Sequence, residues 1–151
     1  MRIAQLAPTY ERVPPAGYGG TELVVGLITE ELVRRGHHVT LYASGDSETS
    51  ATLRSVTSRA VRYGDVVDGV RHAEYFQLMN AQTCFIDAAA GAFDIVHNHA
   101  GIEGLVLAAH SRTPRPSSQL TLGCRTQRCT CSTCSSRWAS MCRWMASLFI
   151  T

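Results

Sequence analysis

The 151-residue sequence lacks the segments that mark membrane-spanning and secreted proteins. The longest weakly polar run, residues 138–150, is too short to cross a bilayer and contains Arg143. No basic stretch followed by an apolar one opens the chain, because Gln5 interrupts the first apolar run and Pro8 stops it. We therefore predict a cytoplasmic protein and leave open a peripheral contact with a membrane surface.

Acidic residues are missing from the last part of the chain. All twelve lie in residues 1–114 beside nine arginines, a net charge of −3, whereas residues 115–151 carry five arginines and no acid. A mildly acidic body gives no electrostatic reason to bind nucleic acid, and we predict no such partner. Before residue 115 the sequence also has a single cysteine, Cys84, which argues against a disulfide scaffold.

Residues 1–114 show alternating strand and helix patterns. Short apolar runs at residues 3–7, 38–43 and 93–97 predict buried strands. Helical spacing predicts helices over residues 21–35, 72–90 and 102–110, whereas residues 48–70 show no clear pattern. Strand–helix–strand alternation indicates a parallel sheet. We predict an α/β fold, a Rossmann-like parallel sheet with helices on both faces, in a domain covering residues 1–114.

The first of these helices has the clearest pattern. Thr21 is a suitable N-cap residue, Glu22 places a negative charge in the first turn, and Gly36 follows the last turn. Five apolar residues share one helical face, which we expect to be buried: Leu23, Val24, Leu27, Ile28 and Leu32.

A glycine-rich stretch, Gly17-Tyr18-Gly19-Gly20-Thr21-Glu22, joins the first strand to this helix. Glycines let the backbone approach a ligand, and the helix N-terminus offers N–H groups and a positive dipole end, so a phosphate or sugar hydroxyl would fit here. A plain flexible turn is the alternative. A small self-contained nucleotide- or NAD-binding module is another: Asp46 lies where a ribose-binding acid would, but the third glycine of that fingerprint is absent.

Two histidines follow the third strand. Alternation places His97 and His99 on one side, at the carboxyl end of the strand where parallel α/β sheets bind ligands. Three roles of this histidine pair are compatible with the sequence: contact with a substrate, a structural role in the loop, and binding of a metal ion. Because no third ligand with matching spacing occurs nearby, we predict no metal.

The pattern is lost after Thr113-Pro114, where a fourth strand is expected and none is recognisable. Residues 115–151 contain twelve serines and threonines, and we interpret them as an irregular tail produced by a changed reading frame. A sheet stopped after three strands would expose an unpaired edge and favour aggregation. A zinc-bound interaction module is the alternative, but only Cys131 and Cys134 have C-x-x-C spacing among the candidate ligands Cys124, Cys129, Cys131 and Cys134.

Several motifs in order resemble one enzyme family. They are RIAQLAP at residues 2–8, PP at 14–15, YGGTE at 18–22, LVRRGHHVTLYASGDS at 32–47 and FDIVHNH at 93–99. Together they resemble the start of a family-4 glycosyltransferase, a retaining enzyme with the two-domain GT-B architecture.

The resemblance implies a nucleotide-sugar donor, an acceptor that it does not identify, and no further cofactor. It also implies that Gly19, Gly20, Thr21, Glu22 and His97 line the substrate cleft and that His99 is a catalytic contact to the acceptor. The family's second domain, which supplies donor-binding glutamates and basic residues, has no counterpart in this sequence. We therefore expect this chain by itself to be inactive.

Overall fold

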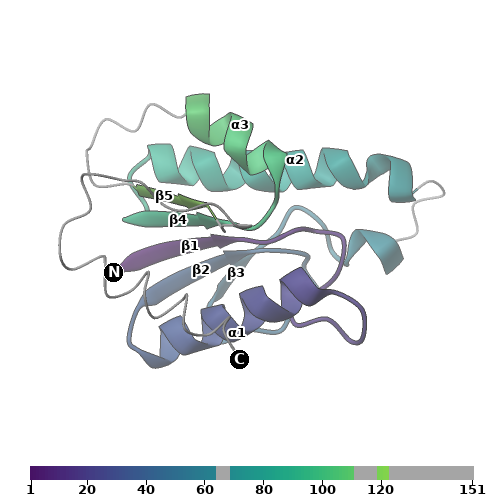
Figure 1. The fold of residues 1–151 in the computed structure, drawn as a ribbon, viewed down its shortest axis with the longest axis horizontal. Helices are drawn as coiled ribbons and strands as arrows, with labels where there is room; N and C mark the ends of the chain where they lie inside the picture. Colours follow the sequence, from purple (N-terminus) through teal and green to yellow (C-terminus); the bar gives the residue numbers. More distant parts are fainter. Residues whose placement is uncertain (64–68, 111–118, 123–151) are drawn as a thin grey trace.

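The computed structural model describes residues 1–63, 69–110 and 119–122. Five parallel strands form one sheet in the order β3-β2-β1-β4-β5 (Figure 1). The strands are β1 (Arg2–Leu6), β2 (His38–Tyr42), β3 (Thr52–Arg54), β4 (Ile95–Asn98) and β5 (Gln119–Leu122). The predicted parallel α/β sheet is therefore confirmed.

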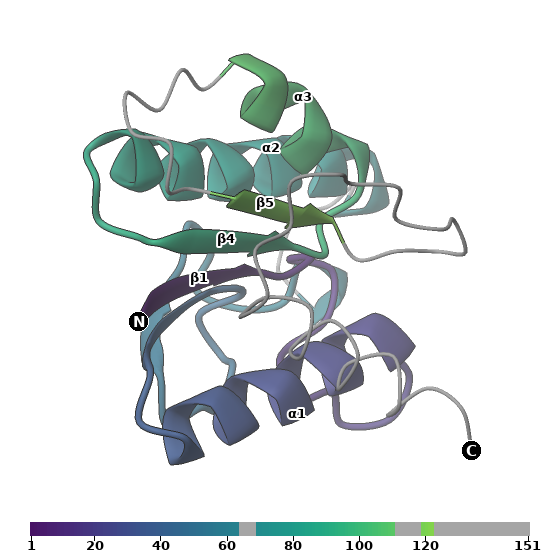
Figure 2. The same cartoon turned by 60° about the vertical axis from the view of Figure 1, so that its left-hand side comes forward.

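Helices cover both faces of the sheet, as predicted. Helix α1 (Gly20–Arg34) lies on one face, and α2 (Gly69–Ala89) with α3 (Ile102–His110) lies on the other (Figures 1 and 2). A short 3₁₀ turn, η1 (Val61–Tyr63), lies in the chain between β3 and α2. This layered arrangement is Rossmann-like.

Alternation along the strands divides the core into two clusters. Between the sheet and α2 the buried residues are Ala4, Leu6, Tyr42, Ala81, Cys84, Phe85, Ala88, Val96 and Ala100. On the α1 face they are Ala7, Val13, Val25, Leu41 and Ala43. Because Gln5 pairs in register with Leu41 and with His97, these three side chains share the α1 face.

The order of strands reverses between β1 and β4. From β1 the chain adds β2 and β3 on one side, and then crosses to add β4 and β5 on the other. In open α/β sheets this switch point leaves a crevice beyond the carboxyl ends of the two strands, and ligands bind there. We call this side of the sheet, at the carboxyl ends of β1 and β4, the carboxyl edge.

Two strands were not predicted. β3 lies in residues 48–70, for which the sequence showed no clear pattern, and it is only three residues long. The prediction that no strand follows Thr113-Pro114 was wrong, because Gln119–Leu122 pairs in parallel with β4. β4 therefore has partners on both sides, and the unpaired edge expected there is absent. Where the domain ends stays a prediction, and residues 123–151 lie outside the described part of the chain.

Helix α1 also differs from its prediction in two respects. Its N-cap is Gly19, so Thr21 lies within the first turn instead of capping it. Its buried residues are Glu22, Val25, Gly26 and Thr29, whereas Leu23 and Leu27 are 48% and 66% exposed. The buried face of α1 is therefore turned away from the predicted one. Gly26 explains this difference, because the helix backbone lies so close to Val13 that a Cβ on Gly26 would be 3.3 Å from Val13 Cγ1.

Candidate functional site at the carboxyl edge

The glycine loop ends in a backbone conformation that needs glycine. Gly19 has φ +138°, and a Cβ there would lie 2.9 Å from Pro15 Cβ. The Gly19 carbonyl accepts the first helical hydrogen bond, from Leu23 N at 3.0 Å, but no side chain caps the helix. The first N–H groups of α1 are thus of the kind that bind phosphate at helix N-termini.

The other residues of this loop divide by exposure. Gly20 and Thr21 are exposed, and a Cβ on Gly20 would meet nothing within 4 Å. Glu22 is buried, and burial raises the pKa of its carboxyl group. A hydrogen bond from its own backbone N–H lowers this pKa, and the nearby Glu11 carboxylate raises it further. Glu22 therefore holds its negative charge less readily than an exposed glutamate would.

His97 and His99 lie together, as alternation predicted. His99 Nε2 is 3.2 Å from His97 Nδ1, and the ring centroids are 4.0 Å apart. β4 ends at Asn98, but the His99 N–H still donates to Leu6 O of β1 at 2.8 Å. This bond holds the pair at the switch point between β1 and β4.

Burial determines the charge of this pair. It lowers the pKa of His97 to about 4 and, together with the neighbouring His97, that of His99 to about 3. Both imidazoles are consequently neutral at pH 7. They can exchange hydrogen bonds with a hydroxyl group, but they do not supply a positive charge.

Gln5 belongs to this cluster and was missed as a site residue. Its Oε1 lies 3.2 Å from His99 Nε2, and the side chain is fully buried. Within the described part of the chain its Nε2 has no hydrogen-bond partner. A polar residue inside an otherwise apolar strand was the signal in the sequence, since buried amides require partners.

Asn98 shapes the loop that carries His99. Its Oδ1 accepts a hydrogen bond from Ala100 N at 2.9 Å, and its Nδ2 donates to Gly101 O at 3.1 Å. A side chain at Gly104 would collide with the Asn98 amide. The turn after β4 is therefore built around Asn98, a role that the sequence alone did not indicate.

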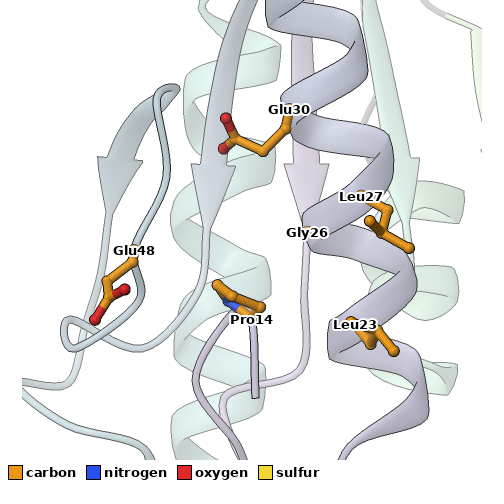
Figure 3. Close-up of a pocket in the computed structure, with 6 residues that line it drawn as sticks. All are labelled: Pro14, Leu23, Gly26, Leu27, Glu30 and Glu48. Carbon is orange, nitrogen blue, oxygen red and sulfur yellow. The ribbon is translucent and has the colours of Figure 1, made fainter. Parts of the chain in front are cut away.

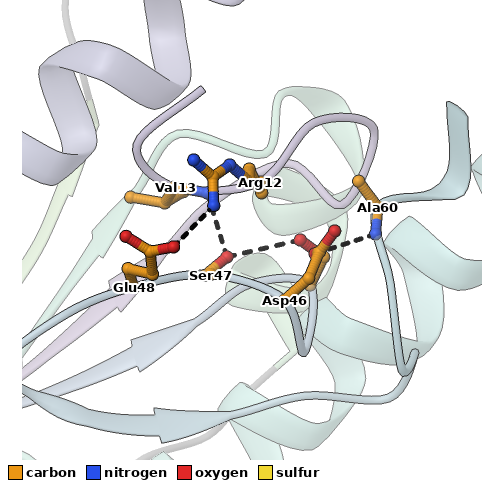
Figure 4. Close-up of polar contacts among 7 residues, drawn as sticks. Arg12, Val13, Asp46, Ser47, Glu48 and Ala60 are labelled. Atoms are coloured by element: carbon orange, nitrogen blue, oxygen red, sulfur yellow. Dashed lines mark hydrogen bonds and ion pairs between the residues drawn. The ribbon is translucent and has the colours of Figure 1, made fainter. Parts of the chain in front are cut away.

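Asp46 has a structural partner. Its Oδ1 accepts a hydrogen bond from Ala60 N at 2.9 Å (Figure 4). In the same loop Ser47 Oγ accepts from Val13 N at 3.0 Å. These bonds tie the turn after β2 to neighbouring loops, in agreement with the simple turn considered from the sequence.

An open pocket of about 210 Å³ lies along α1 and away from the histidines. Pro14, Leu23, Gly26, Leu27, Glu30 and Glu48 line it (Figure 3). The exposed leucines of α1 form its apolar wall. None of its lining residues belongs to β4 or to the loop that follows β4, so the pocket is not part of the carboxyl edge.

Residues 1–63, 69–110 and 119–122 contain neither a metal-binding cluster nor a membrane-spanning helix. In these ranges no group of three or more His, Cys, Asp or Glu residues could hold a metal ion. No helix there is both long and apolar enough to cross a bilayer. The tail cysteines of the zinc alternative lie outside the described residues.

The fold and the carboxyl edge define the class: a Rossmann-like α/β domain with a glycine loop between β1 and α1 and a histidine pair at the end of β4, next to β1. A family model, Glycosyltransferase Family 4, matches residues 18–120, which is more than half of the chain. The match begins within the glycine-rich stretch, at Tyr18, and ends within β5. The chain therefore belongs to glycosyltransferase family 4. No curated protein matches it.

Proposed function

We propose that this chain is the N-terminal part of a retaining GT-B glycosyltransferase that transfers a sugar from a nucleotide-sugar to an acceptor hydroxyl. One observation carries the proposal: a phosphate-type helix N-terminus and a neutral histidine pair follow adjacent strands at the switch point. Membership of the family implies donor and acceptor substrates of these kinds.

Each candidate residue has a role in this proposal. Gly19, Gly20 and Thr21 present backbone N–H groups to the departing diphosphate, while the buried Glu22 shapes the loop. His97 and His99 contact the acceptor or the transferred sugar through hydrogen bonds from neutral imidazoles. Gln5 supports them from β1, because its Oε1 lies within hydrogen-bonding distance of His99.

The reaction requires two events at once. The acceptor oxygen bonds to the anomeric carbon on the face from which the diphosphate leaves, and the acceptor proton passes to the leaving group. Stabilising the diphosphate charge and positioning the acceptor supply most of the acceleration in such a transfer. Neutral histidines serve the positioning, whereas the charge must be met by helix N–H groups and by basic residues of a second domain.

The rest of the proposal concerns the whole protein. We infer that a second domain completes the cleft, that residues 115–151 are read in a shifted frame, and that the enzyme works in the cytoplasm without another cofactor. Neither the NAD module nor the zinc module has better support. In particular, the Asp46 carboxylate already accepts a bond from the Ala60 amide.

A transfer assay tests the proposal. The 151-residue chain and a version translated in the neighbouring frame after codon 114, including its downstream sequence, would be incubated with labelled UDP-, GDP- and ADP-sugars and an acceptor panel. We expect transfer only by the longer version, with loss of activity in its His99→Ala variant. Transfer by the 151-residue chain alone would refute the need for a second domain. If neither version transfers sugar, the result would count against the shifted reading frame.

A further inference from the structure

Three tyrosines surround Arg62 next to the glycine loop. The Arg62 Cζ atom lies 5.9 Å from the ring centroid of Tyr10, 5.7 Å from that of Tyr18 and 5.9 Å from that of Tyr63. These are cation–π distances. Tyr18 is 79% exposed and Tyr63 is 52% exposed. We call these four residues the tyrosine cluster.

The cluster is assembled from segments distant in the chain and is held by defined bonds. The N–H of Arg62 donates to Tyr10 O at 3.2 Å, which fixes η1 to the loop after β1. The Arg62 guanidinium pairs with Glu11 at 2.7 Å, and the Glu11 side chain is only 3% exposed. Tyr18 immediately precedes Gly19 and so brings its ring beside the proposed phosphate-binding loop.

The balance of charge at the cluster indicates what it would bind. Glu11 neutralises Arg62 directly, and Glu22 lies close enough to Glu11 for the two carboxyl groups to interact. Glu11 thus balances the charge of Arg62, and Glu22 adds a second carboxyl group beside Glu11, so no surplus positive charge favours a phosphate here. Exposed aromatic faces are suited to a ring with apolar C–H groups, because C–H hydrogens are attracted to the negative π face.

We propose that the tyrosine cluster is an acceptor subsite for an uncharged pyranose ring, which stacks on Tyr18 and Tyr63 beside the glycine loop. The proposal rests on the proposed function and names the class of its acceptor. Arg62 is a positioning residue that holds the three rings in place while Glu11 balances its charge. The acceptor hydroxyl would then point from the cluster toward the carboxyl edge.

Calorimetric titration of the full chain tests this subsite. The probes are the methyl glycosides of glucose, mannose and galactose, glucose 6-phosphate as a charged comparison, and UDP as a separate measure of the phosphate loop. Tyr18→Ala removes the ring, and Tyr18→Phe is its matched control because it keeps the ring and loses only the hydroxyl group. Thermal unfolding of both variants checks that the fold is unchanged.

We expect at least one methyl glycoside to bind more tightly than glucose 6-phosphate. Tyr18→Ala should weaken it about tenfold, a loss typical of an aromatic contact, while Tyr18→Phe keeps the wild-type affinity. UDP binding should be the same in all three proteins. If UDP binds but Tyr18→Ala leaves glycoside binding unchanged, or no glycoside binds, the subsite is refuted and the proposed function survives. Absence of UDP binding in the longer version that includes the second domain would instead count against the proposed function.

Discussion

The buried histidine pair should make the protein acid-labile well above the pH at which carboxylates titrate. In the unfolded chain each imidazole has a pKa of about 6.5, whereas burial lowers the pKa values in the folded protein to about 4 for His97 and about 3 for His99. Between those limits the unfolded state binds protons that the folded state does not. The free energy of unfolding should therefore fall as the pH drops below about 6.5 and stay constant above it.

The magnitude follows from the same values. At pH 5 each histidine is about 1.5 pH units below its unfolded pKa, which costs about 2 kcal/mol, or about 4 kcal/mol for the pair. With a urea m-value of about 2 kcal/mol/M, the midpoint of unfolding should fall by about 2 M between pH 7.5 and pH 5. A titration that stops at pH 5 ends above the range where acids such as Glu31 and Asp94, whose pKa values lie below the ordinary ones, lose their contribution.

Urea unfolding of three proteins from pH 7.5 to pH 5 measures this effect. The wild type should show the full decrease, and the double variant His97→Gln, His99→Gln should show little of it. His38→Gln is the matched control because His38 is an exposed histidine, and it should behave like the wild type. Equal pH dependence in the double variant and the wild type, or NMR titration of both imidazoles near pH 6.5, would refute the reasoning.

Three other predictions concern single positions. Gly19→Ala should lower the free energy of unfolding measured by chemical denaturation by about 1–3 kcal/mol, because Gly19 has a positive φ and a Cβ there would contact Pro15. Gly20→Ala is the control: a Cβ at Gly20 meets nothing, so the change should be less than about 0.5 kcal/mol. Asn98→Ala should cost about 2 kcal/mol through two lost hydrogen bonds, and thermal melting that matches the wild type would contradict this. Cys84, whose pKa burial raises to about 12, should react with Ellman's reagent only on unfolding, so rapid labelling of the native chain would be inconsistent with the fold.

The main elements of the fold were predictable because strong local patterns agree with tertiary burial. Strands β1, β2 and β4 are short apolar runs, and both Gly36 and Gly91 follow helix ends with positive φ. β3 and β5 were missed for the opposite reason. β3 has only three residues, and β5 lies in a stretch rich in serine and threonine, so neither is a continuous apolar run. Pairing with a neighbouring strand decides whether such a segment is extended.

Packing explains why the buried face of α1 is not the one that the sequence predicted. Leu23 and Leu27 form the more apolar stripe, but the small residues Gly26 and Thr29 let the helix approach the sheet closely. Periodicity reports only where the hydrophobic residues lie, and it does not show that small residues let a helix pack close to a sheet. The exposed leucines instead border the open pocket.

The candidate site was predictable only in part. Alternation correctly placed His97 beside His99, but the contribution of Gln5 depends on the register between β1 and β4. Sequence separation hides that register, because the two strands lie about ninety residues apart in the chain. The same limitation hid Arg62, because its neighbours Tyr10 and Tyr18 lie in the loop between β1 and α1, far from it in the chain.

Chemical-shift mapping of nucleotide-sugar binding tests the central claim most directly. The ¹⁵N-labelled chain would be titrated with UDP-glucose, GDP-mannose and ADP-glucose, with NAD as the comparison. We predict that at least one nucleotide-sugar shifts the amides of Gly19, Gly20 and Thr21 together with the ring signals of His99, and that NAD does not. Shifts confined to the neighbourhood of Asp46 and produced by NAD, or the absence of any shift at the carboxyl edge, would contradict the assignment of this edge to glycosyl transfer.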